Sequence, residues 1–158
     1  MEIQFLTVNP FQTKKLGKIL AEEILKTKPK KTALLIGLEG SLGGGKTTFL
    51  QGFARGLRIK EKILSPTFII MRKFEIRPAL LKGLWQNSEF KNFYHIDCYR
   101  IEKPKEILDL GFKEIISNPQ NIVTIEWAEK IKKVLPRNTI WINFEFIDKN
   151  TRKLIIKK

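Results

Sequence analysis

The residues with the clearest chemical potential form a glycine-rich loop in the first third of the chain. The sequence from Gly40 to Thr47 reads Gly-Ser-Leu-Gly-Gly-Gly-Lys-Thr, which fits the phosphate-binding pattern G-x-x-x-x-G-K-[ST] at every defined position. Glycines let backbone N–H groups close around phosphate oxygens, while Lys46 would reach the β- and γ-phosphates and Thr47 would ligate Mg²⁺. The loop therefore predicts a nucleoside triphosphate site.

Such a loop needs a strand before it and a helix after it, and the neighbouring sequence supplies both. Residues 33–38 form a continuous apolar run, which is typical of a strand buried on both faces. After the loop, Phe49, Phe53 and Leu57 recur at intervals of four and make one apolar face of a helix. Pattern and context therefore favour nucleotide binding over a chance glycine-rich turn.

Two carboxylates that end predicted strands are candidates for organising Mg²⁺ and the attacking water. Asp97 ends the run Asn92–Asp97, and Glu126 ends the run Ile122–Glu126. Parallel neighbouring strands would bring both acids to the same edge of the sheet as the loop. We expect both in the site; the alternative is that each is a solvated strand end that pairs with Arg100 or a lysine.

Two further side chains stand beside these acids. His95 is the only histidine and lies two residues before Asp97, so both would share one face of the strand. Because no second metal ligand is evident near it, we expect His95 to be a hydrogen-bonded structural residue. Trp127 follows Glu126 and is a candidate for stacking on a base or a partner, with a core position as the alternative.

The remaining patterns predict an α/β fold. Asn9-Pro10 is typical of a helix start and predicts a helix over residues 10–26. Helices are also expected at Lys105–Ser117, with an interruption near Gly111, and at Ala128–Val134. Strands are expected at Thr67–Phe74, Asn92–Asp97, Ile122–Glu126, Thr139–Phe146 and Arg152–Ile156. We expect a single domain over residues 1–158, with a P-loop NTPase-type mixed sheet, a parallel core, an antiparallel C-terminal hairpin and flanking helices.

Length, charge and cysteine content narrow the class of protein. The 158 residues are 42% hydrophobic, enough for one core, and no apolar stretch approaches the ~18 residues of a membrane span. The single cysteine and the absence of a leader pattern predict a cytoplasmic protein with no membrane partner. The net charge of +14 favours partners such as RNA, although a lysine-rich composition alone would give the same charge.

Four motifs, taken in order, resemble the TsaE (YjeE) family, and the match covers almost the whole chain. The resemblance implies an ATPase that works with the TsaB and TsaD proteins to make N6-threonylcarbamoyladenosine (t6A) at position 37 of tRNAs that read ANN codons. TsaD would be the transferase, and this chain would assist it. The motifs are Gly40–Thr48, Ser65-Pro66-Thr67-Phe68, Tyr94–Arg100 and Ile125-Glu126-Trp127.

The resemblance also implies roles for matching residues. Thr47 and Glu126 would hold Mg²⁺, Asp97 would position water or the metal shell, and Thr67 would sense the γ-phosphate. Spacing alone does not divide the roles of Asp97 and Glu126. The implied nucleotide contacts are Thr13 at the adenosine end, Gly43, Gly44, Gly45, Lys46, Thr47 and Thr48 at the phosphates, and Arg152.

One segment departs from the family, and two other functions compete with the implied one. Residues 76–91 are longer than the usual connection, and their turn-rich composition predicts a surface loop or an irregular short helix. A small-molecule kinase would use the same loop but needs an arginine-rich lid, and residues 76–91 contain only Arg77. A nucleotide-dependent RNA-binding switch stays open. A GTPase is disfavoured because no Asn-Lys-x-Asp element is present.

Overall fold

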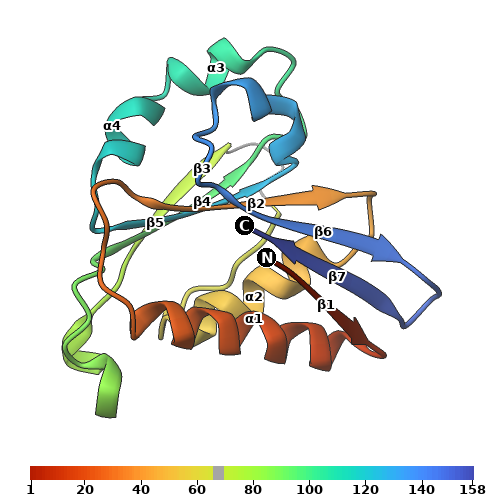
Figure 1. The fold of residues 1–158 in the computed structure, drawn as a ribbon, viewed down its shortest axis with the longest axis horizontal. Coiled ribbons are helices and arrows are strands. Elements are labelled where there is room, and N and C mark those ends of the chain that lie inside the picture. Colours follow the sequence, from red (N-terminus) through yellow and green to blue (C-terminus); the bar gives the residue numbers. More distant parts are fainter. Residues whose placement is uncertain (66–69) are drawn as a thin grey trace.

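The computed structural model describes residues 1–65 and 70–158, which form a twisted sheet with helices on both faces (Figure 1). Within these residues the sheet has seven strands in the order β1-β7-β6-β2-β5-β4-β3. The strands are β1 (Glu2–Thr7), β2 (Leu34–Gly40), β3 (Met71–Glu75), β4 (Asn92–Asp97), β5 (Asn121–Glu126), β6 (Ile140–Phe146) and β7 (Arg152–Lys157).

The sheet has a parallel core with antiparallel edges. Strands β6, β2, β5 and β4 are parallel neighbours, whereas β7 pairs antiparallel with both β6 and β1, and β3 pairs antiparallel with β4. The mixed sheet and the antiparallel hairpin that the sequence predicts are therefore confirmed. The carboxyl ends of β2, β4 and β5 meet at one edge, where α/β folds bind their ligands.

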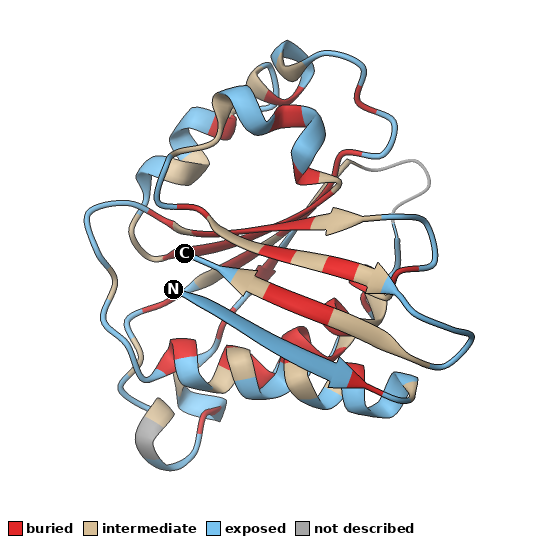
Figure 2. Ribbon diagram, turned by 45° about the vertical axis from the view of Figure 1, so that its right-hand side comes forward, coloured by how far each residue is buried: buried red, intermediate tan, exposed pale blue. Residues whose placement is uncertain are grey.

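Helices cover the two faces of the sheet unequally (Figure 1). Helices α1 (Pro10–Leu25) and α2 (Lys46–Gly56) pack together on one face. The other face carries α3 (Pro104–Leu108), α4 (Phe112–Ser117) and the 3₁₀ segment η3 (Ala128–Val134). Figure 2 shows the buried side of each long helix turned toward the sheet.

The middle residues of β2 and β5 are mostly apolar because these strands face two cores. On β2, Ile36 belongs to the cluster under α1 and α2, while Leu35 belongs to the cluster under α3, α4 and η3. On β5, Ile122 and Val123 divide in the same way. Successive strand residues point to opposite faces, so a strand covered on both sides needs a continuous apolar run.

Helices α1 and α2 approach so closely that their backbones touch. A Cβ atom at Gly52 would lie 1.8 Å from the carbonyl oxygen of Lys14, and one at Gly17 would lie 2.1 Å from that of Phe49. Only glycine leaves room for this crossing. The close contact holds α2, whose first residues carry the phosphate-loop lysine and threonine.

Most predicted elements are present with small shifts at their ends. Asn9 caps α1 by accepting a hydrogen bond from the Gln12 N–H at 2.9 Å, as the sequence predicts. Gly111, with a φ of 78°, separates α3 from α4 at the predicted interruption. The predicted strand Thr67–Phe74 corresponds to β3, which runs from Met71 to Glu75, and residues 66–69 lie outside the described part of the chain. No helix among the described residues is long and apolar enough to cross a bilayer.

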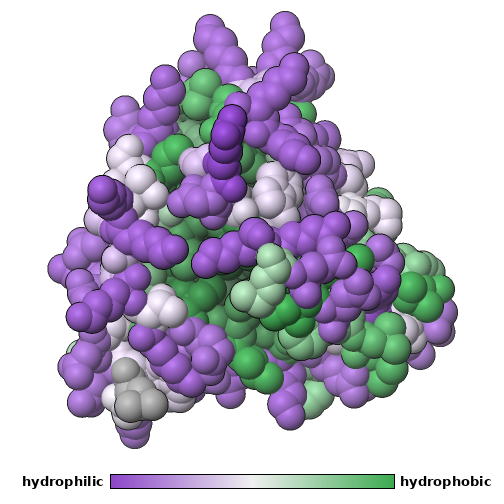
Figure 3. All heavy atoms as spheres, in the orientation of Figure 1, coloured by the Kyte–Doolittle hydropathy of each residue, from purple (hydrophilic) through white to green (hydrophobic). Residues whose placement is uncertain are grey.

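The sequence prediction missed β1. Polar and apolar residues alternate only from Glu2 to Phe5, and Leu6 breaks the pattern, so the sequence signal for a strand is short. In the structure all residues of β1 except Thr7 are exposed. Hydrophobic side chains reach the surface near β1 and the β6–β7 hairpin, in the lower right of Figure 3. They include Leu6, Phe146 and Ile147.

Residues 76–91 form an irregular helical segment, one of the two predicted alternatives. They contain the short 3₁₀ turns η1 (Pro78–Leu80) and η2 (Gly83–Trp85). The Ile76 N–H donates to the Lys91 carbonyl at 2.8 Å and closes the base of the segment. Its buried anchors are Ile76, Leu81 and Phe90.

Candidate nucleotide-binding site

The glycine-rich loop joins β2 to α2 and has the backbone that a phosphate cradle requires. Gly43 and Gly45 have φ values of 73° and 98°, a left-handed region that glycine adopts without strain. Gly45 also caps α2, so the N–H groups of the first helical turn are left without partners inside the helix. These N–H groups and the positive end of the helix dipole together favour an anion.

A pocket of about 260 Å³ lies over this loop and gathers residues from distant parts of the chain. Every nucleotide contact implied by the resemblance lines it, as does Glu126. Trp127, the candidate for stacking, and Ser65, from the second motif, line it as well. The residues that the sequence patterns did not assign to a site are Pro10 on α1 and Lys149 and Asn150 in the β6–β7 turn. The full lining is Pro10, Thr13, Leu42, Gly43, Gly44, Gly45, Lys46, Thr47, Thr48, Ser65, Glu126, Trp127, Lys149, Asn150 and Arg152.

Lys46 lies inside the site with only 4% of its surface exposed. Its ammonium donates to the carbonyl oxygens of Gly40 at 2.7 Å and Ser41 at 2.9 Å. The same Nζ lies 4.0 Å from the centre of the Trp127 ring, within cation–π range. Burial lowers the pKa of Lys46, while the nearby charges of Glu126, Glu129 and Asp97 raise it.

Thr47 and Glu126 place oxygen atoms side by side at the start of α2. The Thr47 hydroxyl donates to Glu126, with Oγ1 at 3.1 Å from Oε1 and 3.0 Å from Oε2. A hydroxyl and a carboxylate next to a phosphate cradle form a donor set that suits Mg²⁺, which prefers oxygen ligands and keeps positions for phosphate and water. The residues present therefore fit the implied metal.

His95 is hydrogen-bonded, as the sequence predicts, and its partner is Glu126. His95 Nε2 lies 3.0 Å from Glu126 Oε1, and both side chains are buried. The contact forms because β4 and β5 are parallel neighbours with His95 opposite Thr124 and Asp97 opposite Glu126. A hydrogen bond from a neighbouring side chain to a metal-binding carboxylate fixes the orientation of that carboxylate.

Asp97 lies beside the pocket without lining it. Its Oδ2 accepts a hydrogen bond from the Ser65 hydroxyl at 2.8 Å, and its Oδ1 accepts one from the Tyr99 N–H at 2.9 Å. Ser65 itself lines the pocket, so it links the carboxylate to the cavity. Thr67, the expected γ-phosphate sensor, lies outside the described residues.

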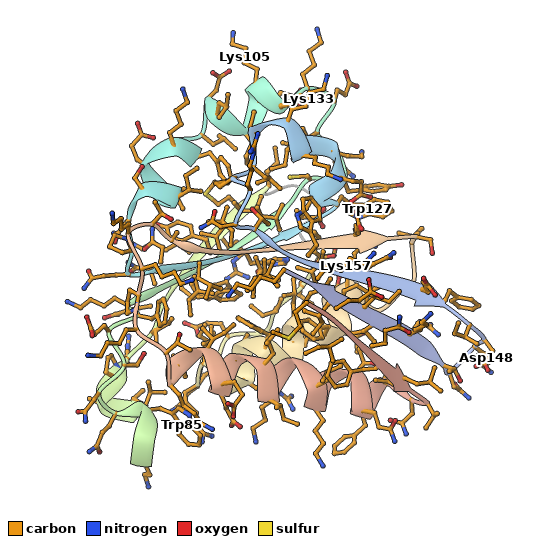
Figure 4. The ribbon with its side chains drawn as sticks, viewed as in Figure 1. Trp85, Lys105, Trp127, Lys133, Asp148 and Lys157 are labelled. Atoms are coloured by element: carbon orange, nitrogen blue, oxygen red, sulfur yellow. The ribbon has the colours of Figure 1, made fainter. Side chains whose placement is uncertain are left out.

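Trp127 forms one wall of the pocket through an unusual backbone conformation. Its φ of 57° is in the left-handed region, which costs a non-glycine residue roughly 1–2 kcal/mol. This turn leads the chain from β5 into η3 and lets the indole contact both Lys46 and Tyr99, whose ring centroid is 5.1 Å away. In Figure 4, Trp127 lies above β2 near the end of the sheet that carries the loop.

Thr13 and Arg152 flank the loop on the side of α1 and the β6–β7 hairpin. Arg152 Nε donates to the Gly43 carbonyl at 3.2 Å. The hydroxyls of Thr13 and Thr7 lie 2.8 Å apart, so β1 supports the pocket from behind. Sequence analysis missed Thr7 because it did not identify the strand that carries it.

Known proteins resemble this chain in sequence and in fold. The family model described as "Threonylcarbamoyl adenosine biosynthesis protein TsaE" matches residues 7–154. The tRNA threonylcarbamoyladenosine biosynthesis protein TsaE of Rickettsia felis is 36% identical over 91% of this chain and 73% of its own length. The Bacillus subtilis protein of the same name is 36% identical over 89% of this chain and 76% of its own. The crystal structure of Bacillus subtilis YdiB superposes with a TM-score of 0.73 and 28% identity, covering 99% of this chain and 84% of that one.

Proposed function

We propose that this chain, which belongs to the TsaE family of tRNA threonylcarbamoyladenosine biosynthesis proteins, is a Mg²⁺-dependent ATPase. Its ATPase activity would assist the threonylcarbamoyladenosine modification of tRNA. The observation that carries the proposal is the hydrogen bond from the Thr47 hydroxyl to the Glu126 carboxylate, at the point where the phosphate loop enters α2. Nucleotide, metal ligands and a water-positioning acid would then share one edge of the sheet.

The loop would bind the triphosphate of ATP. Free N–H groups at the start of α2 would donate to phosphate oxygens, and the buried ammonium of Lys46 would exchange its two carbonyl acceptors for phosphate. The side chains of Arg152 and Thr13 both lie near Gly45, and they would contact the nucleotide there. Trp127 would close the pocket on the side of Lys46.

Thr47 and Glu126 would hold Mg²⁺, which when bound neutralises charge on the β- and γ-phosphate oxygens. His95 would keep the Glu126 carboxylate turned toward Thr47. Asp97 would orient the attacking water, and its own orientation is set by Ser65 and the Tyr99 N–H. Thr67, two residues after Ser65 in the sequence, would sense the γ-phosphate.

ATP hydrolysis would serve the transferase rather than modify tRNA directly. The chain would work in the cytoplasm with TsaB and TsaD. ATP hydrolysis would change the affinity of this chain for the TsaB–TsaD complex and so reset the complex between rounds. Exposed apolar side chains near the nucleotide pocket support docking of a protein partner there. They are Leu42, Phe146 and Ile147.

The test measures ATP hydrolysis by the chain alone and with TsaB and TsaD, with and without tRNA, together with threonylcarbamoyl transfer over repeated rounds. We expect hydrolysis to rise with both partners and repeated transfer to require this chain. Lys46→Ala and Glu126→Ala should abolish both effects, while Lys113→Ala, an exposed lysine on α4, should not. Hydrolysis that ignores both partners, or many rounds supported by a non-hydrolysable ATP analogue, would contradict the proposal.

A further inference from the structure

A second cavity, larger than the nucleotide pocket, lies along the pair formed by α1 and α2. It has a volume of about 750 Å³ and is bordered by both helices, by the residues that follow α2 and by η1. We call it the basic groove. It is lined by Phe11, Lys14, Lys15, Lys18, Gly52, Arg55, Arg58, Ile59, Lys60 and Leu80.

The basic groove concentrates positive charge in its lining. Six of its lining residues are lysine or arginine, and none is aspartate or glutamate. Within the described part of the chain, only one of these six forms an ion pair, Lys18 with Glu22 at 3.8 Å. Arg58 lies over the Trp85 ring, with Cζ 6.0 Å from its centroid. The other four are Lys14, Lys15, Arg55 and Lys60.

This concentration differs from the general lysine excess of the chain. Arg55 and Arg58 are two of only seven arginines in the sequence, and both line the same groove. Arginine offers a planar fork of donors that matches phosphate oxygens, which a random excess of lysine does not explain. The adjoining hollows contain two acids, Glu61, which stands between Lys60 and Lys62 in the sequence, and Glu75, which forms an ion pair with Arg77.

The cations follow one stripe of α1 because of helical spacing. Phe11, Lys14, Lys15 and Lys18 repeat at intervals of three and four residues, so they lie on one helical face. The Phe11 ring is 74% exposed at one end of this stripe, and Leu80 adds an exposed apolar side chain. Cations interleaved with an exposed aromatic ring are typical of surfaces that contact both phosphates and bases.

We propose that the basic groove binds the sugar–phosphate backbone of tRNA. The choice of tRNA over another polyanion rests on the proposed function, whereas the charge and shape of the groove do not depend on it. The groove and the nucleotide pocket share α1 and α2: Thr13 and Thr47 line the pocket, while Lys14 and Arg55 line the groove. The longer segment 76–91 supplies one wall through Leu80 and supports Arg58 through Trp85.

The test compares binding of an unmodified tRNA transcript by three forms of the full chain, without TsaB and TsaD, over a range of salt concentrations. Arg55→Ala/Arg58→Ala removes two cations from the groove. Lys105→Ala/Lys133→Ala removes two from the opposite layer, where Figure 4 shows both lysines pointing into solvent. We expect the first pair to weaken binding at least tenfold and the second less than twofold. The log–log salt slope should fall by roughly 1–2 in the first pair only.

Three outcomes would overturn the inference: no salt-sensitive binding by the natural chain, equal loss in both double variants, or tRNA binding preserved in Arg55→Ala/Arg58→Ala. In the last case, loss of stimulation by TsaB and TsaD in that variant would assign the groove to a protein partner. Basal ATP hydrolysis should be unchanged in both variants, because no altered residue lines the nucleotide pocket. Failure of the proposed function would instead appear in the natural chain, as hydrolysis indifferent to TsaB and TsaD.

Discussion

At the scale of single residues, Glu126 is held by two side chains from different elements. Thr47 at the start of α2 and His95 on β4 both contact its carboxylate, which is 2% exposed. Buried carboxylates need such partners because an unpaired charge away from water is costly. The same contacts leave the carboxylate in one orientation, which a metal ligand requires.

We expect His95→Ala to raise the Mg²⁺ concentration needed for half-maximal ATP hydrolysis about 10–100-fold, because Glu126 loses a second-sphere partner. His95→Gln, which keeps a side-chain N–H donor, should recover most of the natural Mg²⁺ dependence. The measurement is a Mg²⁺ titration of phosphate release, with circular dichroism to verify folding. A His95→Ala variant that is folded and has the natural Mg²⁺ dependence would refute a positioning role.

Cys98 provides a prediction about pH. Burial first, and then the negative charge of Asp97, raise the pKa of its thiol from 9.0 to about 12. The unfolded thiol loses its proton at lower pH than the folded one, so its contribution to stability is complete below pH 9 and declines as pH rises. Between these two pKa values we expect the free energy of unfolding to fall by about 1.4 kcal/mol per pH unit from this group.

The measurement for Cys98 is urea denaturation of the natural chain and of Cys98→Ala below and above pH 9. Other groups also titrate in this range, so the difference between the two proteins isolates the thiol. The natural chain should lose more stability than Cys98→Ala as pH rises. Parallel pH profiles would show that the thiol titrates alike in the folded and unfolded states.

At the scale of elements, the contact between α1 and α2 determines where the phosphate loop lies. The two glycines of the crossing leave no space for a side chain, since a Cβ at Gly52 would overlap the Lys14 carbonyl. The phenylalanines of α2 then pack into the core, with the Phe49 and Phe144 rings edge to face at 5.6 Å. Helix α2 is therefore held both by backbone contact and by aromatic packing.

We expect Gly52→Ala to lower the free energy of unfolding by about 2 kcal/mol or more, because the added methyl group forces the helices apart. ATP binding should weaken as well, since α2 carries Lys46 and Thr47. Ile19→Ala, on the exposed face of α1, is the matched control and should change both quantities little. Denaturant unfolding and nucleotide titration measure them, and a Gly52→Ala protein as stable as the control would show that the crossing can relax.

At the scale of the whole molecule, the nucleotide pocket exists only in the folded chain. Its walls come from α1, the loop, the end of β5 and the β6–β7 turn, which are far apart in the sequence. A ligand that binds only the folded state stabilises it in proportion to the logarithm of its concentration. The proposed nucleotide binding is therefore testable as an increase in thermal stability.

We expect MgATP at about 100 times its dissociation constant to raise the melting temperature by roughly 5–10 °C. Lys46→Ala should show little shift, because the substitution removes the cation that is buried at the phosphate loop. The Lys113→Ala protein, altered on α4 away from the pocket, should respond like the natural chain. An equal shift in Lys46→Ala would mean that the nucleotide binds elsewhere.

Features that depend on local pattern could be predicted from the order of the residues. The phosphate loop, the strand before it and the helix after it follow from glycine spacing and from apolar periodicity, which neighbouring residues encode directly. Asp97 and Glu126 were recognisable because each ends an apolar strand. The break at Gly111 was also local, since glycine adopts a positive φ without strain.

Features that depend on strand order and on packing between distant segments became visible only in the folded chain. The contact of His95 with Glu126 requires β4 beside β5 in parallel register, and the support of Thr13 by Thr7 requires β1 at the edge of the sheet. The basic groove requires α1 to cross α2 at Gly52. Such neighbours are selected by burial over the whole chain, a long-range quantity that no short window of residues contains.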